Sequence, residues 1–326
     1  MLSRVAESVY WMFRYMERAQ NMSRFIDADF NNLLYDPDNK ENAWRSLIAV
    51  TGDQAEYEKR YDAYTQANIV RFLTLDGEYL NSVLSSLVAA RENARSVREI
   101  ISSEMWETIN GLYLLACQYA DKGFGNDPSA FCKAVHDGGF TFTGLFYSTM
   151  NRGDAWHFAR MGMLGERADK TTRILDVKYY ILLPQEQLGG AFDRMQWSAL
   201  LKSASGLEMY RKKYRATEPL NVMEFLLFDA EFPRSVKHCC RYLYESLGAV
   251  CGNPRFSGVA AQTIEPLLHD LSNLDIGQVV NLGMHEYIDE LQARLNAVGQ
   301  DISEAFFGFN PTIKQAGPQH GHQGCA

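Results

Sequence analysis

The residues of this 326-residue chain that could do chemistry are glutamates and arginines at helical spacing. Arg14, Glu17, Asn21 and Arg24 are three, four and three residues apart, so they would line one strip of a helix. Arginines hold carboxylate or phosphate groups through fork-shaped donors, and glutamates serve as acids, bases or metal ligands. A solvated row of ion pairs, each worth less than about 1 kcal/mol, would have the same spacing.

A second segment, about 150 residues later, has the same charged residues at the same spacing. The matching residues are Glu17, Arg18, Arg24 and Asp27 in the first segment, and Glu166, Arg167, Arg173 and Asp176 in the second. The copy is imperfect, since Met163 stands where Arg14 would align and Lys170 where Asn21 would. Surface charges rarely need a particular partner, so the repetition favours a structural network or an anion site over a solvated strip.

A third cluster, Arg91, Glu92 and Arg95, has only a partial counterpart, because Glu245 is kept while Tyr244 and Gly248 replace the arginines. These arginines could bind an anion, but we favour pairing with Glu17 or Glu92 in a buried network between helices.

An enzyme would use the glutamates differently. Glu17 with Glu166, or Glu92 with Glu245, would converge in a cleft as general acid/base or metal-binding carboxylates, aided by Arg91 and Arg95.

Other catalytic or cofactor motifs are missing from the sequence. It has no Glu-x-x-His pair of the di-iron type, no phosphate loop, no dinucleotide fingerprint and no Gly-x-Ser-x-Gly elbow. Glu265 and His269, four residues apart, could form one edge of a metal site, but such a pair is more often a contact on a helix surface. We therefore predict no bound metal and no cofactor.

The elements that position these residues are predicted to be helices, because apolar residues recur at three- and four-residue spacing almost throughout. A first helix from Ser3 to about residue 34 precedes shorter helices over 43–50 and 54–66. A long helical segment from about residue 83 reaches residue 121, and a second long helix, capped by Asp154, ends before Pro184.

Further blocks repeat at an offset of 153 residues. Phe72-Leu73, Asp76, Ser82 and Val83 reappear as Phe225-Leu226, Asp229, Ser235 and Val236, and Trp44, Tyr57 and Tyr61 as Trp197, Tyr210 and Tyr214. We predict an all-α helical bundle of two tandem diverged repeats of about 150 residues. The repeats would span 1–125 and 154–309, with a connecting segment over 126–153 and a disordered tail over 310–326.

The composition narrows the function classes. A net charge of −8 argues against a nucleic-acid surface, and no apolar run has the roughly 20 residues that span a membrane. Charged residues interrupt the N-terminal segment, so we expect no signal sequence and a cytoplasmic protein.

Four segments of the sequence form a familiar set: Met1-Leu2-Ser3-Arg4-Val5-Ala6-Glu7, Arg14-Tyr15-Met16-Glu17-Arg18-Ala19, residues 90–99 and residues 165–178. Through these segments the chain resembles the bacterial alpha-E domain family over nearly its whole length. Members are typically encoded with circularly permuted ATP-grasp proteins and transglutaminase-like proteins. The resemblance implies an accessory or substrate-handling partner of a ligase that forms peptide or amide bonds, acting on a peptide or amino-acid substrate.

Overall fold

The computed structural model describes residues 1–33, 40–124, 128–180, 191–252 and 259–308, which form helices joined by turns and short loops without a strand. The helices before residue 154 are α1 (Ser3–Leu33), α2 (Lys40–Thr51), α3 (Gln54–Glu58), α4 (Gln66–Thr74), α5 (Val83–Ser96), α6 (Ser103–Lys122) and α7 (Ser129–Thr149). Those after it are α8 (Asp154–Tyr180), α9 (Ala191–Ser203), α10 (Leu207–Lys213), α11 (Pro219–Phe228), α12 (Val236–Val250), α13 (Val259–Asn273), α14 (Ile276–Leu282) and α15 (Met284–Phe307). The predicted all-α class is confirmed.

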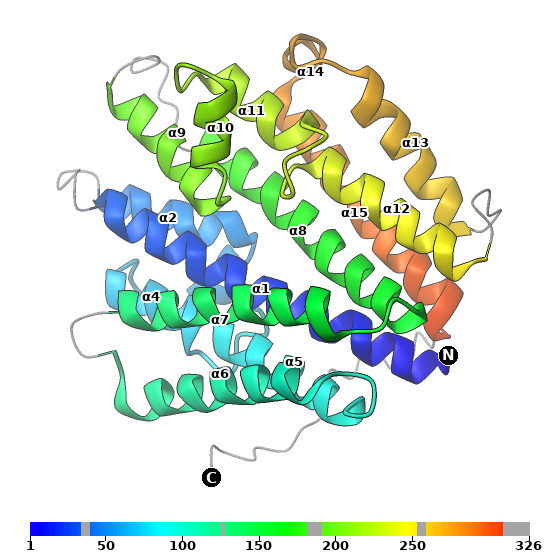
Figure 1. Cartoon of the computed structure of the whole chain (residues 1–326). Helices are drawn as coiled ribbons and strands as arrows, with labels where there is room; N and C mark the ends of the chain where they lie inside the picture. Colours follow the sequence, from blue (N-terminus) through cyan, green and yellow to red (C-terminus); the bar gives the residue numbers. More distant parts are fainter. Residues whose placement is uncertain (34–39, 125–127, 181–190, 253–258, 309–326) are drawn as a thin grey trace.

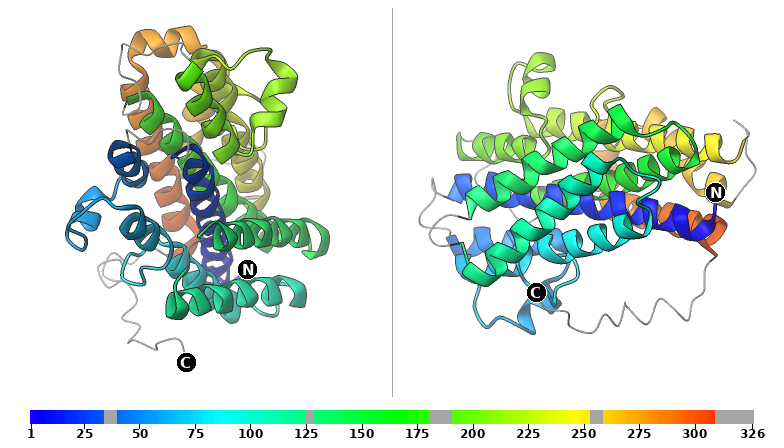
Figure 2. Two further views of the ribbon diagram at one scale, coloured as in Figure 1. Left: turned by 90° about the vertical axis from the view of Figure 1, so that its left-hand side faces the viewer. Right: turned by 60° about the horizontal axis from the view of Figure 1, so that its bottom comes forward.

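The two longest helices, α1 and α8, pack along each other at the centre of the bundle (Figure 1). Helices α5 and α7 pack against α1, whereas α12 and α15 pack against α8 (Figure 2). Helix α9 crosses onto α1 and α2 contacts α8, so each half of the chain supplies a helix to the central helix of the other. Polar residues that α1 and α8 turn toward each other therefore lie deep in the molecule.

Side-chain caps explain where several helices begin. The hydroxyls of Thr65, Ser82, Ser102 and Ser235 each accept a hydrogen bond from a backbone N–H in the first turn of α4, α5, α6 and α12. Such a cap typically stabilises a helix by about 1 kcal/mol.

Two aromatic clusters, one in each half, have the same internal arrangement. Tyr57 stacks on Tyr61 at 5.1 Å between ring centroids, and Tyr210 stacks on Tyr214 at 4.8 Å. Phe72 and Phe225 meet the first tyrosine of each pair edge-on. Both of these first tyrosines also donate their hydroxyl hydrogen to a backbone carbonyl six residues later.

Two local predictions differ from the structure. The helix expected over 54–66 ends at Glu58, and Thr65 begins a separate helix. The segment expected to be helical from residue 83 to 121 is broken between Ser96 and Ser103, where Ser102 caps a new helix. Most of the connecting segment 126–153 is the 21-residue helix α7, packed on α1 and α6. The predicted tail lies outside the described residues.

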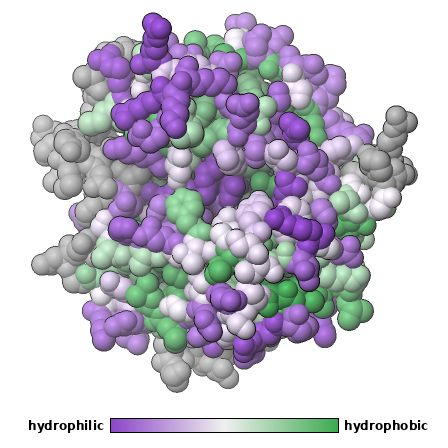
Figure 3. Space-filling view, in the orientation of Figure 1, coloured by the Kyte–Doolittle hydropathy of each residue, from purple (hydrophilic) through white to green (hydrophobic). Residues whose placement is uncertain are grey.

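The surface seen in Figure 3 is hydrophilic over most of its area, with hydrophobic patches between. Within the described part of the chain, no helix combines the length and apolar character needed to cross a membrane. Among the described cysteines, Cys251 is exposed and the others are buried.

Candidate functional site

Glu17 of α1 is buried and surrounded by arginines. Arg167 of α8 donates from Nε and Nη2 to its two carboxylate oxygens at 3.0 and 2.8 Å, and Arg234 donates from Nη1 at 2.6 Å. Burial by itself would raise the pKa of Glu17, but the charges of Arg167 and Arg234 hold it below its ordinary value. Glu17 is thus an ionised carboxylate fixed within the protein.

Glu166 of α8 has the corresponding environment, with a fully buried side chain. Arg18 of α1 donates from Nε and Nη2 at 2.7 and 3.1 Å, Arg14 donates from Nε at 2.9 Å, and Lys170 lies 3.6 Å away. Burial opposes ionisation, yet the three cations lower the pKa of Glu166 well below its usual range.

The two Glu-Arg dipeptides therefore pair reciprocally across the α1–α8 interface: Glu17 with Arg167, and Arg18 with Glu166. This confirms the expectation that both glutamates are interior and bonded to arginines. Sequence reasoning missed Asn81 and Arg234, each of which directly precedes a capping serine. Asn81 accepts a hydrogen bond from Arg18 at 2.8 Å, and Arg234 binds Glu17. Asn81 and Arg234 are separated by the same 153 residues as the other repeated blocks, and this offset could have predicted that they occupy corresponding positions.

Toward the C-terminal end of α8, Asp169 joins the network. Its carboxylate accepts hydrogen bonds from Arg173 Nε at 3.0 and 3.1 Å and lies 3.1 Å from the Lys170 ammonium. Arg173 also donates to the backbone carbonyl of Thr51 at the end of α2.

Arg24, Asp27 and Asp176 lie farther along the two central helices. Arg24 is buried and donates to Ser205 Oγ at 3.1 Å and to Asn21 Oδ1. Asp27 accepts from Ser129, whereas Asp176 pairs with His285 at 2.6 Å. The two aspartates thus bind different elements in the two halves.

Arg91, Glu92 and Arg95 form a separate cluster, so the expected pairing of these arginines with Glu92 is confirmed, whereas pairing with Glu17 and burial of the cluster are wrong. Arg91 donates to Asn110 at 2.8 Å and lies over the ring of Tyr113, and both arginines pair with Glu92. The Arg95 side chain is 66 % exposed. Helix α5 packs against α1 and α6, and the side chains of this cluster are partly exposed to solvent.

Glu245, the counterpart of Glu92, lies on α12 beside Arg160 and Arg241. Figures 1 and 2 place α5 and α12 on opposite sides of the α1–α8 pair. Glu92 and Glu245 therefore do not form a shared site.

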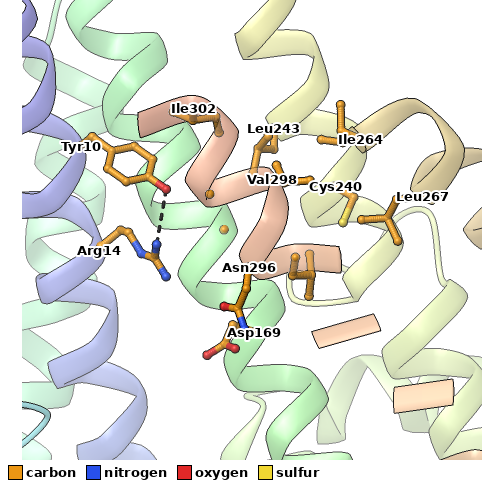
Figure 4. Close-up of a pocket in the computed structure, with 13 residues that line it drawn as sticks. Tyr10, Arg14, Asp169, Cys240, Leu243, Ile264, Leu267, Asn296, Val298 and Ile302 are labelled. Atoms are coloured by element: carbon orange, nitrogen blue, oxygen red, sulfur yellow. Dashed lines mark hydrogen bonds between the residues drawn. The ribbon is translucent and has the colours of Figure 1, made fainter. Parts of the chain in front are cut away.

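A narrow cleft opens beside the network, between α1, α8, α12, α13 and α15 (Figure 4). Its empty space is about 400 Å³, part of it open to solvent. Tyr10, Arg14, Asp169 and Asn296 provide its polar wall, and Arg14 donates to the Tyr10 hydroxyl at 3.4 Å. The apolar wall includes Cys240, Leu243 and Ile264. No glutamate lines this cleft.

Sequence reasoning also missed a group of three potential metal ligands, Asp176, His285 and Asp289, whose ligand atoms lie within 4.8 Å of one another. The imidazole contacts a carboxylate through each nitrogen, at 2.6 Å to Asp176 and 3.5 Å to Asp289. The hydrogen bond to Asp176 raises the pKa of His285. Ion pairing therefore accounts for this geometry. Because Asp176 and His285 are 109 positions apart in the chain, the sequence alone could not indicate that they meet.

Comparison with known proteins matches this chain to a protein family. The Alpha-E model, described as a predicted alpha-helical domain with a conserved ER motif, matches residues 1–307. In one-letter code ER is Glu-Arg, the dipeptide found at 17–18 and 166–167. Uncharacterized proteins of Mycobacterium bovis and Mycobacterium tuberculosis are 22 % identical to this chain over 322 residues. The match covers 92 % of this chain and 36 % of the length of each of those proteins. The chain thus spans about a third of the curated relatives it matches. No solved structure matches it.

Proposed function

This chain belongs to the Alpha-E family, and on that premise we propose that it is an accessory or substrate-handling partner of an ATP-grasp-type ligase that forms peptide or amide bonds. The partners would be a circularly permuted ATP-grasp-like ligase and a transglutaminase-like protein in the cytoplasm, with a peptide or amino acid as substrate.

The observation that carries this proposal is that Glu17 and Glu166 are each paired with arginines. Each carboxylate is buried and bonded to two arginines from the opposite central helix or its neighbours. A general base must reach a substrate proton and have a pKa near the working pH, whereas the pKa of both groups lies below its ordinary value. This environment supports a scaffold better than an enzyme that uses convergent glutamates.

We also propose that the two halves arose by tandem duplication. Support comes from the reciprocal Glu-Arg pairs and the matched aromatic clusters. Asp76 and Asp229 add to it, because each accepts backbone N–H bonds from the residues two and three positions later. In an experimental structure, residues near 4–120 should superpose on residues near 155–270. Matched segments that occupy unrelated positions would contradict duplication.

The accessory function can be tested by reconstitution with the ATP-grasp protein of the same genome. Isothermal titration calorimetry would measure binding, and mass spectrometry would follow ATP-dependent amide formation with and without the chain. We expect a complex and product formation that depends on the folded chain, with heat-unfolded chain as control. Absence of both would contradict the proposal. Conversion of a peptide by the chain alone would favour the enzyme alternative.

A further inference from the structure

Arg24 and Arg173 occupy corresponding places on α1 and α8 but differ in their partners. Four residues before Arg173 is Asp169, whose carboxylate accepts its Nε hydrogen. Four residues before Arg24 is Gln20, a neutral amide that donates instead to the backbone carbonyl of His136 at 3.3 Å. Arg24 therefore lacks the carboxylate that its counterpart has.

In the described part of the chain, the surroundings of Arg24 contain less negative than positive charge. Its side chain is buried, and among the described residues its Nε finds no hydrogen-bond partner. Glu17 is the carboxylate that interacts with it, and Arg167 and Arg234 already bind both oxygens of that group. Three buried guanidinium groups thus share one carboxylate.

Buried charge without a counterion is costly, because the protein interior does not replace the water that the ion loses. Burial and the neighbouring charge of Arg234 accordingly lower the pKa of Arg24 well below its ordinary value. His136 cannot balance this charge, because an imidazole is either neutral or positive, and burial and the charge of Arg24 lower its pKa.

We propose that Arg24 is one side of an oxyanion site that takes a carboxylate or phosphate group. The anion would accept hydrogen bonds from the Arg24 guanidinium, Nε included, and from Ser205. The Ser205 hydroxyl currently accepts from Arg24, so its own hydrogen is available to a ligand. Ser205 is an exposed residue after the end of α9, so a ligand would reach the proposed site from the side of Ser205. The proposal goes beyond the accessory function and does not depend on it.

The test is the effect of small anions on the melting temperature of the full chain. Inorganic phosphate and acetate are each titrated at constant ionic strength against sodium chloride. We expect at least one of them to raise Tm saturably, on the order of 2–4 °C when the site is nearly filled. The more effective anion identifies phosphate or carboxylate as the preferred group.

Three variants locate the effect. Gln20→Glu is nearly isosteric and supplies the missing carboxylate, so it should remove the anion-dependent shift and raise Tm in chloride. Arg24→Gln should also remove the shift. Arg173→Gln is the matched control, because it changes the corresponding arginine that already has Asp169, and it should keep the shift.

Two results would overturn the proposal. One is that neither anion stabilises the wild-type chain more than chloride does. The other is that Gln20→Glu retains the full shift, and this variant decides the matter even when Arg24→Gln fails to fold.

Discussion

Glu17 on α1 accepts two hydrogen bonds from Arg167 on α8, a residue 150 positions later in the chain. One residue farther along α1, Arg18 donates two hydrogen bonds to Glu166, the residue before Arg167. The two dipeptides therefore bind each other twice, in opposite senses, and connect the two central helices.

Removing the Glu166 charge should destabilise the protein strongly. Glu166→Gln keeps the side-chain shape but leaves Arg14, Arg18 and Lys170 around a neutral amide. Loss of one partner from a buried ion pair costs on the order of 3–5 kcal/mol in the free energy of unfolding. Urea unfolding followed by circular dichroism measures this loss. Glu208→Gln is the control, because Glu208 is 74 % exposed in its pair with Arg211, and this change should have little effect on stability.

Stability should fall in acid because of these carboxylates. In the folded protein the pKa of Glu17 and Glu166 lies below 4.5, the ordinary value that an unfolded chain would show. The unfolded chain then binds more protons, so their contribution is complete above that pH and is lost as pH falls below it. The contribution of these two glutamates to the free energy of unfolding should be complete above about pH 5, and unfolding free energies measured down to pH 3 should decline below about 4.5 as it is lost. The decline should be shallower in Glu17→Gln, and an equally steep decline would contradict this assignment.

The close contact between α1 and α8 should be sensitive to a single methyl group. A Cβ added at Gly162 would overlap the backbone carbonyl oxygen of Tyr10, so Gly162→Ala must push the helices apart. We expect a loss of about 1–3 kcal/mol in the free energy of unfolding. Gly144→Ala on α7 is the control, because nothing lies within 4 Å of its added Cβ, and it should be neutral or stabilising by about 0.5–1 kcal/mol. Equal effects would refute the close-contact explanation.

We predict no tightly bound transition metal. Asp176, His285 and Asp289 are near enough to form part of a site, but the imidazole already contacts carboxylates through both nitrogens. Elemental analysis of tag-free protein should find no stoichiometric zinc or iron. Stoichiometric metal that disappears in His285→Ala would show the prediction to be wrong.

The sequence predicted the helical class and the burial of the glutamates, because periodicity and repeated spacing report local structure and shared constraints. It could not predict which arginine binds which glutamate. Arg167 pairs with Glu17 rather than with its neighbour Glu166, and only the packing of α1 on α8 determines this. The break at Ser102 was missed for a related reason, since apolar spacing continues on both sides of the turn before Ser102.

We expect the reciprocal Glu-Arg pairs to stabilise the fold rather than to perform chemistry. A double-mutant cycle on the free energy of unfolding, with Glu17→Gln, Arg167→Met and the double variant, tests it most directly. We predict that the two changes are coupled by on the order of 2–3 kcal/mol, as expected for a buried pair in contact. Effects that add within about 0.5 kcal/mol, in variants that remain stable but lose ligase activation, would contradict this expectation.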